Sequence, residues 1–354
     1  MRQTILITGG AGFIGTNFVY HCVSKYPEYK IVVIDRLTYA GNLENIQSLL
    51  DSNKIEFVSG DISDSKLIRE LFKKYEFSKV VNFAAETHVD RSIVAPGEFV
   101  QTNIVGTHTL LAACREFDVP RYHQVSTDEV YGDLGTNSTD YFTEATPIAP
   151  NCPYAASKAA ADLLVRSYHE TYGMHATISR CSNNYGPYQF PEKLIPFFFQ
   201  LASQDKPLPM YGDGKNVRDW LYVEDHCEAI DLILHNAKPG AVYNIGGHNE
   251  KENIQIAQMI LSYLEKPETL LTYVEDRKAH DRRYAIDPKK LETELGWSPK
   301  TTFAEGIKKT FTWYNENREW WQHIVDRQAI YTNRKHIGIT QSPTSKKTSK
   351  DLKK

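Results

Sequence analysis

Tyr154 and Lys158 are four residues apart in a segment that begins at Pro153. Proline suits the first turn of a helix, so both side chains are expected on one helix face. A phenol with a pKa of about 10 is a poor base at neutral pH, but a nearby ammonium group and a positive nicotinamide ring favour the phenolate. The pair therefore predicts a base that removes a hydroxyl proton while hydride leaves for a nicotinamide, with Lys158 also holding the nicotinamide ribose.

Thr127, Asp128 and Glu129 follow an apolar run at 121–125 that predicts a strand. Ligands of open parallel sheets lie beyond the carboxyl ends of the strands, so these residues should face the nicotinamide. Thr127 can bond the sugar hydroxyl that is oxidised. Once a carbonyl forms, a carboxylate can remove the neighbouring carbon-bound proton, and a carboxylic acid can protonate a departing hydroxyl. The alternative is that both acids belong to an ordinary turn.

Gly9, Gly12 and Gly15 lie between a predicted strand, Thr4–Thr8, and a helix that starts at about Phe13. Glycines at this spacing permit a tight turn, a close approach of the backbone to a pyrophosphate, and close packing of helix on sheet. The helix N-terminus then offers free N–H groups to phosphates. Because strand and helix flank the motif correctly, it predicts a dinucleotide site.

Asp35 ends the second predicted strand, where a carboxylate can accept hydrogen bonds from the adenosine ribose. It would repel a 2′-phosphate and so favours NAD over NADP, although Arg36 could accommodate that phosphate. Asp61, after the third strand, could bind the adenine amino group or simply form a turn.

Short apolar runs alternate with amphipathic stretches along the first half of the chain, which predicts βαβ units and a parallel sheet. We expect a doubly wound α/β, Rossmann-type domain in 1–180, to which about 220–245 returns. A smaller C-terminal substrate-binding domain is expected from 181–219 and 246–325. Predicted strands are 4–8, 30–34, 55–58, 79–83, 121–125, 176–180 and 242–245, and predicted helices include 65–75, 96–117, 193–203, 223–235 and 254–265, with a loop at 181–191.

The composition, with 41% hydrophobic and 24% charged residues and a formal net charge of −3, is that of a globular protein without a nucleic-acid or membrane surface. Five scattered cysteines form no C-x-x-C pair, which argues against a disulfide framework or a zinc site and fits a reducing cytoplasm. We see no signal peptide, membrane span or metal site. The polar, Lys- and Ser-rich tail at 332–354 is expected to be disordered.

The chain resembles the extended short-chain dehydrogenase/reductases, most closely those that act as dTDP-glucose 4,6-dehydratases. The resemblance runs from about Thr4 to Trp321, and its specific segments are 37–42, 86–92, 126–132, 181–188, 191–196, 218–223 and 243–247. It implies that Tyr154 takes the C4 hydroxyl proton, Glu129 removes the C5 proton and Asp128 protonates the departing C6 hydroxyl. It also implies a recycled, tightly held NAD and a homodimer formed through about 96–117 and 153–172.

Carried over residue by residue, the resemblance implies two sets of contacts. The cofactor contacts are Gly9, Gly12, Phe13, Ile14, Gly15, Asp35, Thr38, Asp61, Ile62, Ala84, Ala85, Thr102, Tyr154, Lys158 and Asn184. The substrate contacts are Thr87, Thr127, Asn183, Lys193, Leu194, Tyr211, Arg218, Asn253, Arg277 and His280. Arginine grips phosphate through paired hydrogen bonds, so Arg218 and Arg277 suit a diphosphate.

Two departures from the family pattern leave the choice between thymidine and uridine open. Ala279 stands where the family usually has glycine, and Thr87 where it usually has serine. UDP-sugar 4-epimerases and nucleotide-sugar decarboxylases share the glycine motif and the Tyr/Lys pair, but lack the acid at Asp128. A catalytically inactive NAD-binding scaffold would need a damaged site, whereas all five predicted catalytic residues are present.

Overall fold

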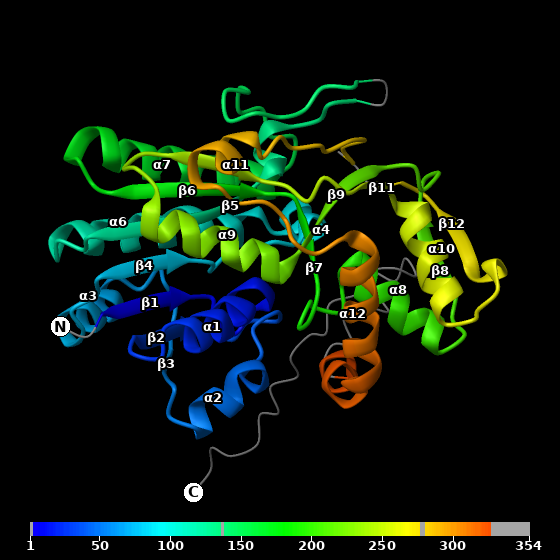
Figure 1. The fold of residues 1–354 in the computed structure, drawn as a ribbon, viewed down its shortest axis with the longest axis horizontal. Helices are drawn as coiled ribbons and strands as arrows, with labels where there is room; N and C mark the ends of the chain where they lie inside the picture. Colours follow the sequence, from blue (N-terminus) through cyan, green and yellow to red (C-terminus); the bar gives the residue numbers. More distant parts are fainter. Residues whose placement is uncertain (1–2, 136–137, 277–279, 327–354) are drawn as a thin grey trace, which may run out of the picture.

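A computed structural model describes residues 3–135, 138–276 and 280–326. Its largest sheet has seven parallel strands in the order β10-β6-β5-β4-β1-β2-β3 (Figure 1). Their bounds are β1 Thr4–Thr8, β2 Lys30–Asp35, β3 Ile55–Ser59, β4 Lys79–Asn82, β5 Arg121–Thr127, β6 Ala176–Cys181 and β10 Val242–Ile245. The predicted doubly wound sheet is confirmed. The strand order reverses direction between β1 and β4, which is where ligands bind in such sheets.

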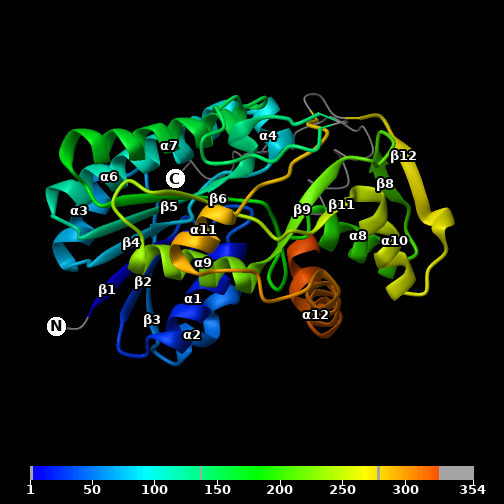
Figure 2. The ribbon, with the colours of Figure 1, turned by 45° about the horizontal axis from the view of Figure 1, so that its top comes forward.

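Helices cover both faces of this sheet because its strands are apolar on both sides. Ile5 and Ile7 of β1 enter one core with α1 Phe13–Lys25 and α9 Val223–Asn236, whereas Leu6 enters the opposite core with α3 Ser65–Lys74 and α6 Thr107–Glu116. Figure 2 shows α3, α6 and α7 (Pro153–Tyr172) on one side of the sheet and α1, α2 (Gln47–Asp51) and α9 on the other. An apolar core therefore packs against each face of the sheet, and the carboxyl ends of its strands form the site.

A third apolar core lies beside the sheet and is built from the later part of the chain. Its helices are α8 Leu194–Ser203, α10 Asn253–Tyr263 and α12 Phe303–Glu316, with α11 Lys289–Leu295 packed against β10 instead. Its strands are β7 Asn183–Tyr185, β9 Val217–Tyr222 and β11 Glu250–Glu252 in one small sheet, and β8 Leu208–Tyr211 with β12 Leu271–Val274 in another. The loop predicted at 181–191 thus contains a short strand, because β7 finds a parallel partner in β9.

The single helix predicted over 96–117 is interrupted. The structure has α4 Val89–Val94 and α5 Pro96–Phe99, followed by a π-helical turn at Val100–Gly106 that leads into α6. The side chain of Asn103, inside this turn, is buried and bonds the backbone N–H and carbonyl of Glu86 at 2.9 and 3.0 Å. Widened turns of this kind are frequent at functional sites, and here the turn brings an amide beside the segment that follows β4.

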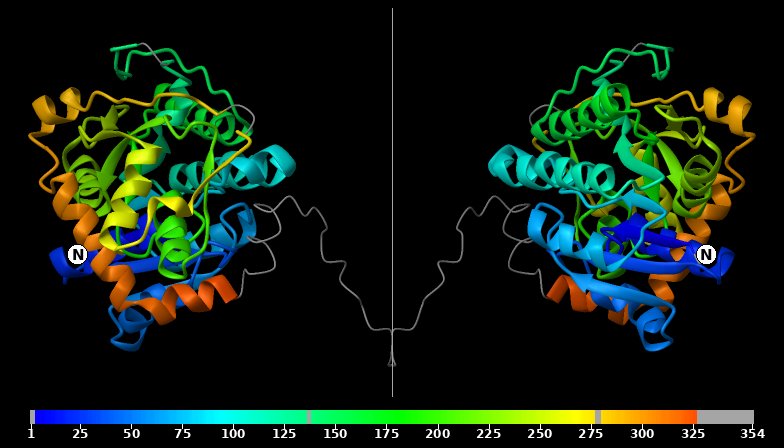
Figure 3. Two further views of the ribbon diagram at one scale, coloured as in Figure 1. Left: turned by 90° about the vertical axis from the view of Figure 1, so that its right-hand side faces the viewer. Right: turned by 90° about the vertical axis from the view of Figure 1, so that its left-hand side faces the viewer.

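The long connection between β5 and α7 reaches out from the rest of the ribbon (Figure 3). It is attached to 283–287, since the backbone N–H of Phe142 bonds the carbonyl of Ala285 at 2.9 Å. Arg277 and the tail at 332–354, both singled out from the sequence, lie outside the described residues.

Candidate active site

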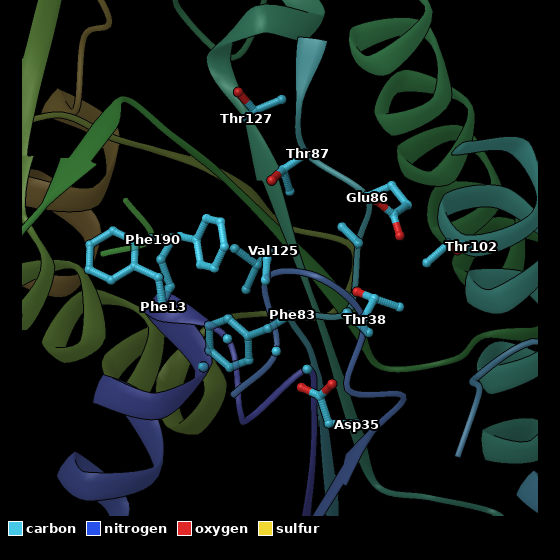
Figure 4. Close-up of a pocket in the computed structure, with 18 of the residues that line it drawn as sticks. Phe13, Asp35, Thr38, Phe83, Glu86, Thr87, Thr102, Val125, Thr127 and Phe190 are labelled. Atoms are coloured by element: carbon cyan, nitrogen blue, oxygen red, sulfur yellow. The ribbon is translucent and has the colours of Figure 1, made fainter. Parts of the chain in front are cut away.

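A cavity of about 290 Å³ opens at the carboxyl ends of the central strands. It is lined by the ends of β1, β2, β4, β5 and β6 together with residues that precede α8. Figure 4 shows Asp35 at one end of the cavity and Thr127 at the other, with Phe13 and Phe190 to one side. All fifteen predicted cofactor contacts line it, so the structure brings that entire set together.

The glycine-rich turn allows no side chain at two of its positions. Gly9 has φ +66°, and a Cβ there would lie 2.7 Å from the backbone nitrogen of Ala84. A Cβ on Gly15 would lie 2.2 Å from the carbonyl oxygen of Gly9. Gly12 caps α1 without any side-chain bond to the first turn, so N–H groups of α1 remain available to a ligand. This turn is a cradle suited to phosphate groups.

Asp35 uses both carboxylate oxygens to shape the turn. Oδ2 accepts the N–H of Ala11 at 3.0 Å, and Oδ1 accepts the N–H of Leu37 at 2.8 Å. Burial raises the pKa of Asp35 in spite of these two bonds. Because each oxygen retains a further lone pair, the carboxylate can still accept from a ribose hydroxyl.

The side chain of Arg36 forms an ion pair with Asp61, with 2.8 Å between Nη1 and Oδ2. Asp61 also accepts bonds from the backbone and hydroxyl of Ser63, both at 2.9 Å. Burial raises the pKa of Asp61, but the bonds from Ser63 and Arg36 outweigh it and leave the pKa below its usual value. The guanidinium that could have accepted a 2′-phosphate is thus engaged by an ionised carboxylate.

Tyr154 and Lys158 lie on the buried face of α7. Nζ of Lys158 donates to the carbonyl of Val125 at 2.6 Å. Burial and the charge of Glu129 raise the pKa of Tyr154 well above its usual value, while a hydrogen bond with Thr127 opposes them. Burial also lowers the pKa of Lys158, against the charge of Asp162. A phenolate at Tyr154 therefore requires additional positive charge within the cavity.

Thr127, Asp128 and Glu129 form the junction of β5 with a 3-10 helix at Asp128–Tyr131. Oγ1 of Thr127 caps this helix by accepting the N–H of Glu129 at 3.3 Å, and it donates to Oδ1 of Asp128 at 3.3 Å. Burial, followed by the charges of Glu129 and Asp219, raises the pKa of Asp128 well above its usual value. Among the described residues Oδ2 of Asp128 has no partner. Asp128 is therefore suited to carry a proton, while Glu129 faces the cavity.

The predicted substrate contacts are divided by the structure. Thr87, Thr127, Asn183 and Lys193 line the cavity, whereas Leu194, Tyr211, Arg218, Asn253 and His280 lie outside its lining. Arg218 is buried, and its two terminal nitrogens donate to the carbonyls of Val217 at 2.7 Å and Asp281 at 2.9 Å. Its guanidinium lies 4.3 Å from the centre of the Tyr284 ring. Arg277 lies outside the described residues.

Comparisons with known proteins identify the family of this chain. The family model described as GDP-mannose 4,6 dehydratase matches residues 6–310. A dTDP-glucose 4,6-dehydratase of Xanthomonas campestris pv. campestris is 52% identical over 91% of this chain and 96% of its own. The chain belongs to the dTDP-glucose 4,6-dehydratase family.

Two solved structures of this family superpose closely. The dTDP-glucose 4,6-dehydratase of Bacillus anthracis, solved in complex with NAD, has a TM-score of 0.85 and 48% identity and covers 91% of this chain and 99% of its own. The enzyme of Streptomyces venezuelae, also with NAD bound, has a TM-score of 0.87 and 45% identity, with coverage of 91% and 100%. The fold is thus shared with dehydratases of known structure.

Among the cavity-lining residues that were not predicted as contacts are Glu86, Gln189, Phe190 and Glu192. Glu192 is partly buried, which raises the pKa of its carboxyl, and its Oε2 lies 3.6 Å from Nε2 of His88. The available signal was a charged side chain inside two of the segments that carry the family resemblance, 86–92 and 191–196.

Among the residues that the structure describes, no helix is long and apolar enough to span a membrane.

Proposed function

We propose that this protein converts dTDP-glucose into dTDP-4-keto-6-deoxyglucose and water, with NAD recycled in each turnover. One observation carries the proposal. Adjacent acids at the end of β5 differ in environment, with Asp128 buried and suited to hold a proton and Glu129 exposed to the cavity that Tyr154 and Lys158 also line. A simple dehydrogenase or an epimerase needs the Tyr/Lys pair but has no use for a second acid and base.

The residues present fit NAD. The glycine cradle leaves room for a pyrophosphate where a Cβ at Gly9 or Gly15 would collide, and Asp35 stands where a ribose would lie. The ion pair between Arg36 and Asp61 removes the most obvious partner for a 2′-phosphate, which favours NAD over NADP. NAD held by these residues would supply a hydride acceptor for C4 and a hydride donor for C6. Its positive ring also supplies the charge that favours a phenolate at Tyr154.

The chain's own groups move the protons. Tyr154 accepts the C4 hydroxyl proton, and Thr127 bonds the oxygen at C4. The resulting ketone acidifies the C5 proton, which Glu129 removes, while Asp128 gives its proton to the C6 oxygen so that water leaves. Glu129 then returns a proton to C5, and exchange with solvent carries the proton on Tyr154 away and restores the one on Asp128. The net change is the loss of one water molecule.

The substrate contacts are part of the same proposal. We assign 181–219 and 246–325 to substrate binding, with Lys193, which lines the cavity, and Arg218, which lies outside its lining, as cationic groups for the diphosphate. A homodimer is supported by exposed apolar side chains on the two helical segments predicted to pair, namely Val100 and Val105 in one and Leu163 and Tyr172 in the other. A cytoplasmic location is supported by five cysteines that are all buried free thiols.

The deciding experiment incubates the purified protein with dTDP-glucose, without added NAD, and follows the 4-keto product by its absorbance in alkali. Product formation supports both the dehydratase reaction and a retained cofactor. The same assay with UDP-glucose distinguishes the two bases. If neither sugar nucleotide gives product even with added NAD, the dehydratase proposal fails and the epimerase and decarboxylase alternatives return.

Variants of the two acids sharpen the test. Glu129→Gln should abolish exchange of the C5 hydrogen with solvent deuterium as well as turnover. Asp128→Asn should slow product formation by about 100-fold or more, yet retain exchange at C5, because only the protonation of the leaving group is lost. Loss of exchange in Asp128→Asn would contradict the division of roles between the two acids.

A further inference from the structure

Arg180, on β6, joins two parts of the catalytic machinery without lining the cavity. Its Nε donates to Oδ2 of Asp162 at 2.9 Å, and its Nη1 donates to the hydroxyl of Tyr131 at 2.9 Å. All three side chains are buried, and none of them is among the residues that line the cavity. A buried guanidinium with a different partner on each side fixes the distance between them, because its donors have a rigid, planar arrangement.

On one side this arginine reaches the helix of the oxidation pair. Asp162 is one turn beyond Lys158 on α7, so both side chains lie on the same buried face. Oδ1 of Asp162 has no hydrogen-bond partner among the described residues. The groups that act on the charge of Lys158 are Asp162 on its own helix and Cys181 at the end of β6, and both oppose the lowering of its pKa by burial. Asp162 thus forms its ion pair with Arg180 while its charge also favours the protonated form of Lys158.

On the other side Arg180 reaches the helix of the elimination pair. Tyr131 is the last residue of the 3-10 helix that begins with Asp128 and Glu129. Its hydroxyl donates to Oδ1 of Asn244 at 2.7 Å, and its ring stacks on Phe142 with 5.1 Å between the centroids. A helix of one turn has little stability of its own, so the position of its acids depends on what its far end contacts.

We propose that Asp162, Arg180 and Tyr131 form a positioning unit that holds the oxidation pair, Tyr154 and Lys158, and the elimination pair, Asp128 and Glu129, in register on one sugar. The inference rests on the proposed function, because only a reaction that oxidises C4 and eliminates across C5 and C6 requires both pairs to act on the same bound molecule. Errors of about 1 Å in such placement cost on the order of 100-fold in rate. The three residues act through others and touch no reacting atom.

The first test is Tyr131→Phe, which removes one hydroxyl and keeps the stacked ring. Its matched control is Tyr243→Phe, since Tyr243 is equally buried, donates one bond at 2.8 Å to Glu294, and lies on β10 away from the cavity lining. We expect Tyr131→Phe to lower turnover roughly 10-fold to 100-fold while C4 oxidation continues. Reduced cofactor should then accumulate in the near-ultraviolet spectrum during turnover, and deuterium exchange at C5 should slow. The control should show neither change.

The second test is Asp162→Asn, with Asp162→Glu as the conservative variant. Asp162 supports the protonated form of Lys158, so its neutralisation should lower the pKa of Lys158. The alkaline limb of the pH profile of turnover should therefore move to lower pH, and Asp162→Glu should restore it. NAD affinity, measured by fluorescence titration of the stripped protein, should weaken in Asp162→Asn because Lys158 is expected to hold the nicotinamide ribose.

Wild-type product formation tests the proposed function, and the comparison between variants tests the positioning unit, so the two can fail separately. Urea unfolding of all four variants separates structure from positioning. If Tyr131→Phe lowers oxidation and elimination equally, or lowers only stability as its control does, the inference is overturned. An unchanged alkaline limb in a folded Asp162→Asn protein would likewise overturn the role of Asp162.

Discussion

The two ends of the cavity are built in different ways. At the cofactor end the walls are backbone, supplied by glycines at which a side chain would collide and by N–H groups at the start of α1. On the substrate side, two of the expected contacts that lie outside the cavity lining are long side chains bonded to the protein itself. Arg218 donates to two backbone carbonyls, and His280 pairs with Asp276 at 2.5 Å.

The cofactor side of the cavity is therefore preformed, whereas the substrate side must exchange hydrogen bonds within the protein for hydrogen bonds to the ligand. The glycine turn packs closely against neighbouring backbone, which leaves it few alternative conformations and suits it to bind a cofactor without rearrangement. If Arg218 binds the diphosphate as proposed, it must give up or share its carbonyl partners. The cofactor end is thus suited to a ligand that stays bound, and the substrate end to one that enters and leaves in each turnover.

Tyr154 lines the cavity near Thr127 and Glu129, and its loss should have the largest effect. Tyr154→Phe removes the hydroxyl that accepts the C4 proton, so turnover should fall about 1,000-fold. Both ends should still bind, which retained NAD after purification and an unchanged affinity for dTDP would demonstrate. Loss of NAD from this variant would contradict the separation of the two ends.

A side chain in the glycine cradle should disable only the cofactor end. In Gly15→Ala the new Cβ would lie 2.2 Å from Gly9 O, a backbone atom that cannot move without opening the turn. We expect NAD affinity to fall about 100-fold and the protein to purify largely without NAD. Gly135→Ala is the control, because a Cβ there meets no atom within 4 Å, although its φ of +74° adds backbone strain. Equal NAD content in the two variants would argue against a rigid cradle.

At the substrate end the expected effect is smaller and falls on KM. Arg218→Lys keeps the charge but loses the paired geometry with which guanidinium grips a diphosphate, so KM should rise about 10-fold with little change in kcat. Steady-state kinetics with dTDP-glucose would check this result. A fall in kcat at constant KM would instead place Arg218 with the catalytic groups, close to Asp128, whose charge it influences.

A region remote from both ends should affect stability alone. Asp231 on α9 is buried and binds Lys25 of α1 at 2.6 Å, with His21 and His235 at 3.3 and 3.0 Å. Burial alone would raise its pKa, but the bonds from His21, His235 and Lys25 outweigh it and leave the pKa far below its usual value. The stabilisation is therefore present above the unfolded pKa of about 3.9 and is lost as the pH falls below it.

Asp231→Asn should accordingly cost about 3 kcal/mol in urea unfolding at neutral pH, and less as the pH falls below about 4. The control is Asp205→Asn, which breaks an exposed ion pair with Lys266 and should cost under about 1 kcal/mol. Neither variant should change KM or NAD content. A kinetic effect of Asp231→Asn would mean that the contact between α1 and α9 reaches the cofactor end.

The sequence by itself determined the features that depend on backbone and spacing. Alternation of apolar runs predicted the parallel sheet, the three glycines predicted the turn after β1, and four-residue spacing predicted that Tyr154 and Lys158 share a face of α7. Such patterns are local, since each restricts the backbone of a few consecutive residues. The full set of cofactor positions came instead from the family resemblance, and all fifteen of them line the cavity.

Only the tertiary structure decided the features that depend on burial and on partners distant in the chain. It pairs Arg36 with Asp61, gives β7 a strand partner and buries Asp128 enough to favour its protonated form. It also places Arg180 between α7 and the helix after β5, and engages Arg218 with carbonyls rather than with the cavity. A side chain's charge and orientation follow from the packing of segments that no local spacing can bring together.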